Sequence, residues 1–462
     1  MPKHVIILAA GEGKRMKSDL PKVAHLAAGR PLVAHVIDTA QHLDPASITV
    51  VVGHGADQVE RLLPDGVGHG LQVEQLGTGH ATQIGLEATG PIDPDDVVLI
   101  LYGDTPLLTP GLLARLTDLA DGESARLVSA HMDDPTGYGR VIRDVDGEVT
   151  GIVEHRDCSP EQLTINEINA GIYAVRASRL VDALKAVTNE NAQGEYYLTD
   201  VVGILVAEGD RLSAVETSPQ EVMGINSHDQ LAEARKELHQ RINRGLMDSG
   251  VMIFDPDRTY IDESVSVAPG AQIYPGTHLE GSTTVGEGTR VGPDVFAVDS
   301  NIGSNAVVWY AVLREAVVGD DCEVGPYASL RPGTVLEKGS KVGTFVETKN
   351  TTMGEGAKAN HLAYLGDADV GARTNIGAGV VTVNYDGVGK AKTEIGEDAF
   401  IGSDTMLVAP VTIGDRASTG AGSVITKDVS DDALAIERSD QREIPGYAQR
   451  REARKAAKKA KD

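Results

Sequence analysis

Between Val318 and Gly343 the chain reads VGDDCEVGPYASLRPGTVLEKGSKVG, and this stretch decides the fold of the C-terminal half. An aliphatic residue returns at every sixth position, often followed by glycine, as in Val318-Gly319 and Val342-Gly343. A period of six fits neither a helix nor a simple alternating strand. It is typical of a hexapeptide β-solenoid, in which each short strand points one aliphatic side chain inward. One coil cannot bury that face alone, so we expect the coils to stack into a rigid prism.

The same period extends beyond this stretch in both directions. Its positions are Val267, Ile273, Leu279, Val285, Val291, Val318, Val324, Leu330, Leu336, Val342, Ile395, Ile401, Leu407 and Ile413. The first 225 residues lack it, so two unlike folding units share the chain. We expect the first unit at residues 1–228, a connecting amphipathic helix at 229–249 and the solenoid with a basic tail at 250–462.

Composition and charge narrow the class of protein. The 462 residues carry a formal net charge of −26, which argues against sequence-independent nucleic-acid binding because such binding needs basic patches. The two cysteines, Cys158 and Cys322, suggest neither a disulfide scaffold nor a zinc site. The N-terminus does not resemble a signal peptide, and no apolar run approaches the ~20 residues that span a bilayer. We therefore expect a cytoplasmic protein without membrane insertion.

The C-terminus is basic in an otherwise acidic chain. From Arg450 to Asp462, seven lysines and arginines stand against two acidic residues. A solvated tail is the interpretation that such a charge run favours, and contact with a nucleotide or cofactor is the alternative.

The first unit alternates apolar strands with helical stretches. Strands are expected at His4–Ala10, Ile48–Val52, Val97–Tyr102 and Arg126–Ala130, with helical spacing between the first two. This alternation predicts a doubly wound, Rossmann-like α/β sheet, in which ligands bind beyond the carboxyl ends of the strands.

Two features follow strands of this sheet. The first is the glycine-rich loop after Ala10, whose backbone could approach an anion; Lys14, Arg15 and Lys22 favour a phosphate over an ordinary strand–helix turn. The second is Asp104, which directly follows a buried strand and could ligate a divalent cation bound to phosphates. A helix-capping role for Asp104 is the alternative.

Polar residues gather where the solenoid period is interrupted, between Val342 and Ile395. His361 could act as a base that Glu347 orients, and Arg331 and Lys349 could bind a sugar phosphate. The alternative is a solenoid that serves only for trimerisation.

Several motifs resemble those of a known family. The segments LAAGEGKRM with Pro21-Lys22, Gln75–Ala81, Asp134–Arg140, Ile152–His155 and Asn191–Tyr197 resemble sugar-1-phosphate nucleotidyltransferases. Together they are similar to the bifunctional bacterial N-acetylglucosamine-1-phosphate uridyltransferase/glucosamine-1-phosphate N-acetyltransferases, and the likeness covers nearly the whole chain. One departure is Lys14, where that family commonly has threonine. The resemblance implies a left-handed parallel β-helix and a homotrimer with sites between subunits.

The resemblance also implies the roles of residues in the first unit. Leu8, Ala9, Ala10, Gly11, Lys22, Gln72, Gly77 and Thr78 would hold the uridine nucleotide. Tyr102, Gly103, Asp104, Gly139, Glu154 and Asn169 would line the ribose and sugar pocket, and Asp104 and Asn226 would hold Mg²⁺. The sugar phosphate that attacks UTP is already anionic, so catalysis would rest on positioning and on charge neutralisation by Mg²⁺, Arg15 and Lys22.

In the solenoid the resemblance implies an acetyltransferase site. His361 would take a proton from the amine of glucosamine-1-phosphate, which then attacks acetyl-CoA. Arg331, Lys349, Tyr364 and Asn375 would bind the amino sugar, and Ala378, Asn384, Tyr385, Ser403, Ala421 and Arg438 would bind acetyl-CoA. A donor near Asn384 or Ser403 would stabilise the oxyanion.

The resemblance thus implies a bifunctional enzyme that acetylates glucosamine-1-phosphate and then joins N-acetylglucosamine-1-phosphate to UMP from UTP, supplying peptidoglycan precursors. A single-activity nucleotidyltransferase with a non-catalytic solenoid is the alternative. A purely structural scaffold would leave both polar groups of residues unexplained.

Overall fold

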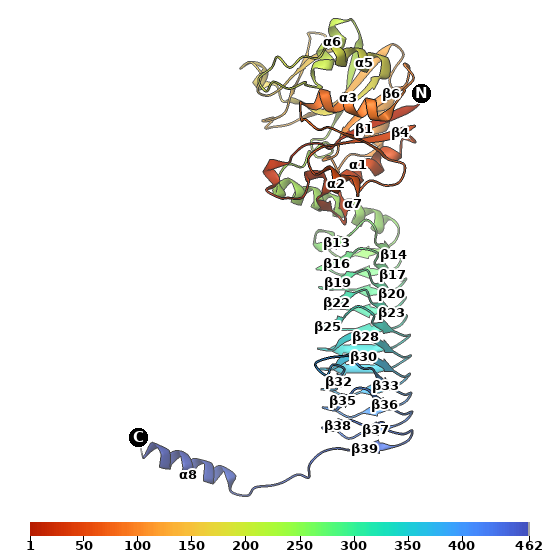
Figure 1. Ribbon diagram of the computed structural model, residues 1–462, viewed down its shortest axis with the longest axis vertical. Coiled ribbons are helices and arrows are strands. Elements are labelled where there is room, and N and C mark those ends of the chain that lie inside the picture. Colours follow the sequence, from red (N-terminus) through yellow and green to blue (C-terminus); the bar gives the residue numbers. More distant parts are fainter. Residues whose placement is uncertain (461–462) are drawn as a thin grey trace. The chain divides into compact units, whose positions relative to one another are not determined.

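The protein is composed of two compact units. The computed structural model describes residues 1–460, and contacts divide the chain into Met1–Gly245 with Tyr260–Glu263, and Leu246–Thr259 with the residues from Ser264 onward (Figure 1). The first unit contains a mixed sheet and most of the helices. The second is built from short strands that repeat in coils.

The sheet of the first unit has the strand order β11-β7-β10-β6-β1-β4-β5, with β8 and β9 paired beside β10. Its strands are β1 (Lys3–Leu8), β4 (Ser47–Val52), β5 (Gly68–Leu71), β6 (Val97–Tyr102), β7 (Glu123–His131), β8 (Arg140–Arg143), β9 (Val149–Val153), β10 (Glu167–Arg176) and β11 (Arg211–Thr217), while β2 (Leu26–Ala27) and β3 (Arg30–Pro31) form a separate pair. Pairing is parallel between β1 and β4, β1 and β6, β4 and β5, and β7 and β11. By contrast, β10 runs antiparallel to β6 and β7. The α/β class is confirmed, and the sheet is mixed rather than wholly parallel.

Helices cover both faces of this sheet. Successive residues of a strand point to opposite sides, and because both sets are apolar here, both faces must be buried. Val5 and Ile7 belong to one apolar cluster, with residues of α1 (Leu32–Gln41) and α4 (Pro110–Thr117). Ile6 and Leu8 belong to the other, with residues of α3 (Thr78–Thr89), α5 (Ala177–Ala186) and α6 (Asp200–Ala207). The short α2 (Ala56–Glu60) follows β4.

The predicted connecting helix is α7 (His228–Asp248). Leu231, Ala234 and Leu238 are buried at the spacing expected of an amphipathic helix, and they pack in a third apolar cluster with Met16 and Ile225.

The second unit is a parallel β-helix, seen in Figure 1 as a column of stacked strands. One sheet contains β12 (Met252–Ile253), β15 (Gln272–Ile273), β18 (Arg290–Val291), β21 (Val307–Val308), β24 (Glu323–Val324), β27 (Lys341–Thr344), β29 (Lys358–His361), β31 (Asn375–Ile376), β34 (Phe400–Ile401), β37 (Ser418–Thr419) and β39 (Leu434–Ala435). The other strands that follow β13 (Thr259–Ile261) are β14 (Ser266–Val267), β16 (Thr277–Glu280), β17 (Thr284–Val285), β19 (Phe296–Val298), β20 (Asn301–Ile302), β22 (Ala311–Arg314), β23 (Val317–Val318), β25 (Ala328–Leu330), β26 (Val335–Leu336), β28 (Glu347–Met353), β30 (Tyr364–Val370), β32 (Val381–Val383), β33 (Thr393–Ile395), β35 (Met406–Val408), β36 (Val411–Ile413) and β38 (Val424–Ile425).

The aliphatic period accounts for the core of this unit. Every one of the fourteen periodic positions named above is buried, from Val267 at 7% exposure to Leu330 at 0%. The prediction of a hexapeptide solenoid is therefore confirmed. The longest break in the coils is the segment 384–392 between β32 and β33, and the last helix, α8 (Tyr447–Lys459), follows β39 in the chain.

Candidate functional sites

A cavity of about 230 Å³ lies at the carboxyl ends of β1 and β6. We call it the β1–β6 cavity. Its lining includes many of the residues predicted to hold a nucleotide and sugar, namely Leu8, Ala9, Ala10, Gly11, Lys22, Gln72, Gly77, Thr78, Tyr102 and Asp104. These residues are far apart in the sequence, and the strand order brings them to one sheet edge, where α/β folds bind ligands.

Glycines allow the loops of this cavity to approach closely. A Cβ at Gly77 would lie 2.6 Å from the carbonyl oxygen of Tyr196, and the φ of Gly77 is +111°, in the region that favours glycine. The adjacent Gly79 amide donates to the same carbonyl at 2.8 Å. Gly11, in contrast, has open space around its Cβ position, so its backbone is accessible to an anion.

Lys22 connects the two predicted metal ligands. Its ammonium donates to Asp104 Oδ2 and, at 3.0 Å, to Asn226 Oδ1. The side chains of Lys22 and Asp104 are only 15% and 12% exposed. The carboxylate and the amide oxygen thus converge on one cation. Helix α4 is capped by Thr109, whose hydroxyl accepts from the Leu112 amide, so the alternative of Asp104 as a helix cap is wrong.

The predicted sugar-binding residues lie together beside this cavity. The Asn169 amide donates to the Gly139 carbonyl at 2.9 Å, and a Cβ at Gly139 would lie 3.6 Å from Glu154 Oε2. The side-chain amide of Asn169 donates to Tyr173 Oη at 2.7 Å. Burial raises the pKa of Glu154 above its ordinary value, although a hydrogen bond from Thr199 opposes the shift. Burial also raises the pKa of Tyr102 far above its usual range, so the phenol stays protonated.

The three cations of the glycine-rich loop lie in different surroundings. Lys14 pairs with Glu12 at 2.8 Å, so its charge is compensated locally. Arg15 is exposed on the short 3₁₀ helix Lys14–Met16 and does not line the β1–β6 cavity. Only Lys22 of the three lines the cavity.

Two polar residues that line the cavity, Gln75 and Glu195, were not assigned from the sequence. Both fall within motifs that carried the family resemblance, Gln75–Ala81 and Asn191–Tyr197. The motifs were therefore the signal that could have identified them.

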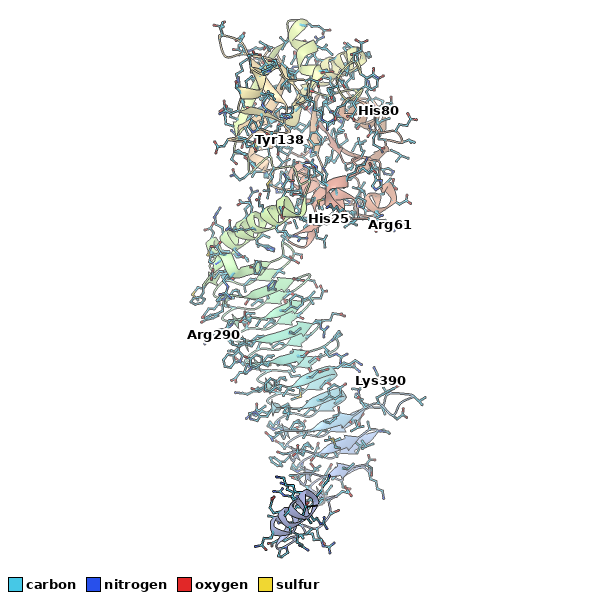
Figure 2. The ribbon with its side chains drawn as sticks, turned by 90° about the vertical axis from the view of Figure 1, so that its left-hand side faces the viewer. His25, Arg61, His80, Tyr138, Arg290 and Lys390 are labelled. Carbon is cyan, nitrogen blue, oxygen red and sulfur yellow. The ribbon has the colours of Figure 1, made fainter. Side chains whose placement is uncertain are left out.

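In the second unit, the predicted amino-sugar residues lie on neighbouring coils. Arg331 donates to Glu347 Oε1 at 2.8 Å, and Glu347 is paired in register with Tyr364 on the next coil. Lys349 lies against Lys390, and this neighbouring ammonium lowers the pKa of Lys390. Figure 2 labels Lys390 on the loop that leaves the coils after β32. Sequence reasoning missed Lys390, although it lies in the insertion that interrupts the six-residue period.

His361 ends β29 and is paired in register with Thr344 of the preceding coil. Its side chain is exposed, and among residues 1–460 its ring has no hydrogen-bond partner. Glu347 bonds to Arg331 instead. The structure therefore does not bring Glu347 and His361 into the hydrogen bond that the sequence suggested.

Asn384 is held beside Tyr364 by a small polar network. Its side-chain amide and that of Asn350 donate to the two oxygens of Asp367 at 2.5 and 2.8 Å. Although burial opposes the shift, these two bonds hold the pKa of Asp367 below its ordinary value. Gly366 makes this packing possible, because a Cβ there would lie 2.4 Å from Tyr364 Oη and 2.8 Å from Asn384 Nδ2.

The predicted acetyl-CoA residues form a column along the coils below His361. The amide of Asp404 donates to the Ala378 carbonyl, and the amide of Gly422 donates to the Ser403 carbonyl, so these turns stack directly. Arg438 reaches the same column and donates to the Ala421 carbonyl at 2.9 Å. Asn375 lies on β31, in the same coil as Ala378, and Tyr385 is exposed on the loop after β32.

An aromatic stripe, defined as the half-buried Tyr310 and the exposed Tyr327 and Phe345, runs along successive turns of the prism. Tyr327 and Phe345 are stacked with ring centroids 5.6 Å apart, and Tyr310 lies 5.6 Å from Tyr327. Tyr327 and Phe345 are 59% and 61% exposed, and Leu362, 62% exposed, extends the stripe to the turn that carries His361.

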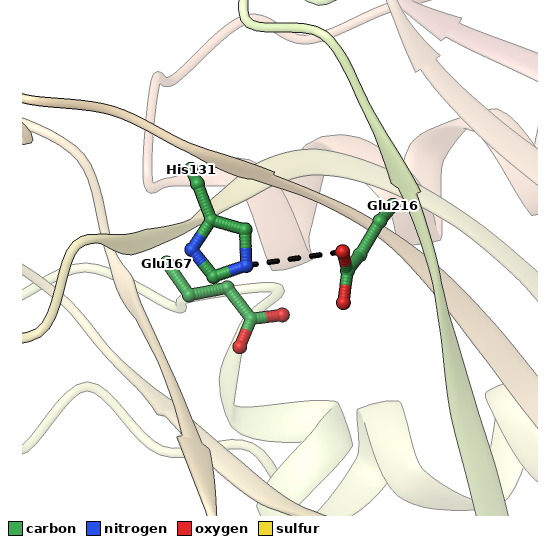
Figure 3. Close-up of side chains that lie close together, drawn as sticks. All are labelled: His131, Glu167 and Glu216. Carbon is green, nitrogen blue, oxygen red and sulfur yellow. Dashed lines mark ion pairs between the residues drawn. The ribbon is translucent and has the colours of Figure 1, made fainter.

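Figure 3 shows a separate group of His131, Glu167 and Glu216, on three neighbouring strands of the first unit. Their potential ligand atoms lie within 4.8 Å of one another. Arg143, however, donates two hydrogen bonds to Glu167, at 2.8 and 2.6 Å, and so supplies the cation of this group. Burial raises and Arg143 lowers the pKa of Glu167, and the net shift is downward. We assign this group to an ion-pair network that links the strands.

Comparison with known proteins identifies both units. The MobA-like NTP transferase domain matches residues 5–199, and the bacterial transferase hexapeptide, as six repeats, matches residues 392–427. The chain is 48% identical to the bifunctional protein GlmU of Streptomyces avermitilis over 99% of this chain and 96% of that protein. The chain belongs to the GlmU family of bifunctional enzymes.

Other GlmU proteins match as completely. That of Clostridium beijerinckii is 46% identical over 98% of this chain and 99% of its own, and that of Stutzerimonas stutzeri is 48% identical over 97% and 99%. Because these GlmU proteins match across both units, the chain is the bifunctional enzyme rather than a nucleotidyltransferase with an unrelated solenoid. No helix within residues 1–460 is long and apolar enough to cross a membrane.

Proposed function

We propose that the two activities of this GlmU enzyme reside at the two groups of residues described above, one in each unit. The enzyme makes UDP-N-acetylglucosamine, a precursor of the cell wall, and is both a uridyltransferase and an acetyltransferase. The second unit transfers an acetyl group from acetyl-CoA to glucosamine-1-phosphate. The first then transfers UMP from UTP to N-acetylglucosamine-1-phosphate and releases pyrophosphate.

The β1–β6 cavity is the proposed site of uridyl transfer. The backbone of Leu8–Gly11, with Gln72, Gly77 and Thr78, would hold the nucleotide, and Gly139, Glu154 and Asn169 would hold the sugar. The attacking oxygen of the sugar phosphate is already anionic, so no protein base is required. The chain's own contribution is to position the two phosphates and to neutralise their charge with Lys22 and, on closure of its exposed loop, Arg15.

Asp104 and Asn226 fit a Mg²⁺ ion. Both present oxygen atoms, the donor type that Mg²⁺ prefers, and both already converge on one cationic group, the Lys22 ammonium. When bound, Mg²⁺ would neutralise negative charge on the UTP phosphates.

The coils around His361 are the proposed site of acetyl transfer. The exposed imidazole can accept a proton from the amine of the sugar, while Arg331, Lys349, Tyr364 and Asn375 hold the amino sugar and its phosphate. Because Lys349 and Lys390 lie close together, they form a doubly cationic position for that phosphate. The column of Ala378, Ser403 and Ala421, with Asn384, Tyr385 and Arg438, would receive acetyl-CoA, and Asn384 or Ser403 would donate to the oxyanion.

We also propose a homotrimer formed through the aromatic stripe. Two exposed rings, Tyr327 and Phe345, continue a row that begins at the half-buried Tyr310, and a contiguous exposed apolar patch of this kind marks an interface. Because Leu362 extends the stripe beside His361, a neighbouring copy seated there would complete the acetyltransferase site.

The observation that carries the proposal is that two separate groups of chemically suitable side chains occur on a chain that matches GlmU proteins throughout. The test is an assay of both half-reactions with the full-length protein. His361→Ala should abolish CoA release from acetyl-CoA and glucosamine-1-phosphate, while pyrophosphate release from UTP and N-acetylglucosamine-1-phosphate persists. Joint loss in a folded variant would contradict two independent sites. The cytoplasmic location and the absence of nucleic-acid binding stay predictions from the sequence.

A further inference from the structure

Helix α8 (Tyr447–Lys459) is a cationic helix without a partner in the core. None of its residues is buried. Its six basic residues form two adjacent rows at i, i+4 spacing, Arg450, Arg454 and Lys458 in one and Arg451, Lys455 and Lys459 in the other. Alanines 453, 456, 457 and 460 fall on the remaining side of the helix.

This helix is poorly suited to exist alone in water. Each row places like charges at i, i+4 spacing, which destabilises an isolated helix. At 13 residues, α8 is also near the length below which isolated helices are only marginally stable. The sole acidic residue of the helix, Glu452, lies 3.2 Å from Lys455 and 3.5 Å from Arg451, so a single negative charge faces six cations. An anionic surface along the cationic side would remove the repulsion and stabilise the helix.

Such a surface lies on the prism of the same chain. We define the acidic corner as the stacked turns at residues 286–288, 303–305, 319–321, 337–339, 354–356, 371–373, 396–398, 414–416 and 430–432. Backbone hydrogen bonds connect turn to turn, for example from Arg373 N to Glu355 O and from Arg416 N to Glu397 O, each at 2.8 Å. The acidic corner contains ten acidic residues, Glu287, Asp320, Asp321, Glu337, Glu355, Glu397, Asp398, Asp415, Asp431 and Asp432. Its three basic residues pair within it, Lys338 with Asp321, Arg373 with Glu397 and Asp398, and Arg416 with Asp432, so the corner keeps a net negative charge.

The dimensions of the helix and of the acidic corner agree. Turns of an α-helix repeat every ~5.4 Å, and neighbouring coils of a β-helix are ~4.8 Å apart, so successive cations can face successive coils. A 13-residue helix is about 20 Å long, or about four spacings between coils, so it can face the five turns from 354–356 to 430–432. The acidic corner ends at Asp432, just before β39, and residues 436–446 can extend over at most ~40 Å, which is enough to return α8 along the last coils.

We propose that α8 docks along the acidic corner of its own chain, with its cationic rows facing the last coils. The short linker of residues 436–446 raises the effective concentration of the acidic corner around α8, which favours it over an anionic molecule in solution. The chain as a whole has a formal net charge of −26, so it also repels anionic lipids and nucleic acids. Individual surface pairs are weak and screened by salt, so the docking acts through their number and disappears at high ionic strength.

Amide hydrogen exchange of the full-length protein tests this inference. We expect the amides of α8 to exchange at least tenfold more slowly at 50 mM NaCl than those of a peptide of residues 440–462, with the protection lost at 500 mM. Glu355→Lys/Glu397→Lys should remove the protection. Glu315→Lys/Glu190→Lys, the same charge change at exposed acids outside the acidic corner, should leave it intact.

A second variant separates loss of docking from local misfolding. Adding Arg454→Glu/Lys458→Glu to Glu355→Lys/Glu397→Lys inverts both surfaces and should restore protection. Equal exchange in the peptide and the full chain would overturn the inference, as would full protection in Glu355→Lys/Glu397→Lys. Protection that appears only with anionic vesicles or with RNA would also overturn it. Cross-linking in a mixture of isotopically heavy and light chains gives a further test, because cross-links from α8 that join only different copies would overturn docking within one chain.

Discussion

The contact of Lys22 with both proposed metal ligands leads to a prediction about cation binding. Because the ammonium of Lys22 donates to Asp104 and Asn226, a divalent ion must displace it before it can bind both oxygens. We expect Lys22→Met, which removes the charge and keeps most of the side-chain length, to bind Mn²⁺ more tightly than the native protein when no nucleotide is present.

The size of the effect follows from the bond that is displaced. A hydrogen bond between charged groups contributes about 1.5–3 kcal/mol, and Lys22 and Asp104 are largely shielded from water. At 1.4 kcal/mol per factor of ten, removing the competitor should tighten Mn²⁺ binding by roughly 10- to 150-fold. Uridyl transfer should nevertheless fall, because the same lysine is proposed to neutralise the phosphates.

Free Mn²⁺ can be measured directly by electron paramagnetic resonance during a titration of the nucleotide-free protein. Lys14→Met is the matched control, because Lys14 is a lysine of the same loop that pairs with the exposed Glu12. Adding Asp104→Asn to Lys22→Met should cancel the gain and so locate the ion. Equal or weaker Mn²⁺ binding by Lys22→Met would refute the reasoning.

Three further predictions concern other parts of the chain. Gly366→Ala should lower kcat/KM for acetyl transfer by about 10- to 100-fold with uridyl transfer unchanged, because its Cβ would displace Tyr364 from the proposed amino-sugar site; equal losses in both assays would contradict this. Tyr327→Ser/Phe345→Ser should convert trimers to monomers in sedimentation experiments, and an unchanged trimer would show that the aromatic stripe is not the interface. Glu154→Gln should raise the melting temperature of the unliganded protein at neutral pH. Burial raises the folded pKa of Glu154, so its ionisation costs stability as pH rises through that pKa, and the difference should vanish below the ordinary carboxyl pKa.

The sequence was most informative where one physical rule repeats. The six-residue period predicted the burial of residues from Val267 to Ile413, because each coil of a solenoid places the same position inside. The direction of β10 was not accessible in this way. A buried apolar strand has the same composition whether it runs parallel or antiparallel to its neighbours, and no rule of spacing distinguishes the two.

The sites were only partly predictable for a related reason. Lys22 is 82 residues from Asp104 and 204 from Asn226, so their convergence came from the family resemblance and not from spacing. The expected bond between Glu347 and His361 overlooked the register of the coils. Neighbouring strands pair at an offset of 17 residues, which sets Tyr364 beside Glu347 and Thr344 beside His361. Lys390 was missed because its loop lies outside the repeat.

The antiparallel direction of β10 determines which of its residues lie at the ligand-binding edge of the sheet, where β1 and β6 end. The parallel strands β1 and β6 place their last residues at that edge. The antiparallel β10 places its first residues there, and Asn169 is one of them. A side chain three residues into a forward strand would lie on the far side of the molecule. Because β10 is reversed, the two halves of a ligand contact strands that run in opposite directions. Insertions before β10 can therefore change the proposed sugar-binding residues without changing the nucleotide-binding ones.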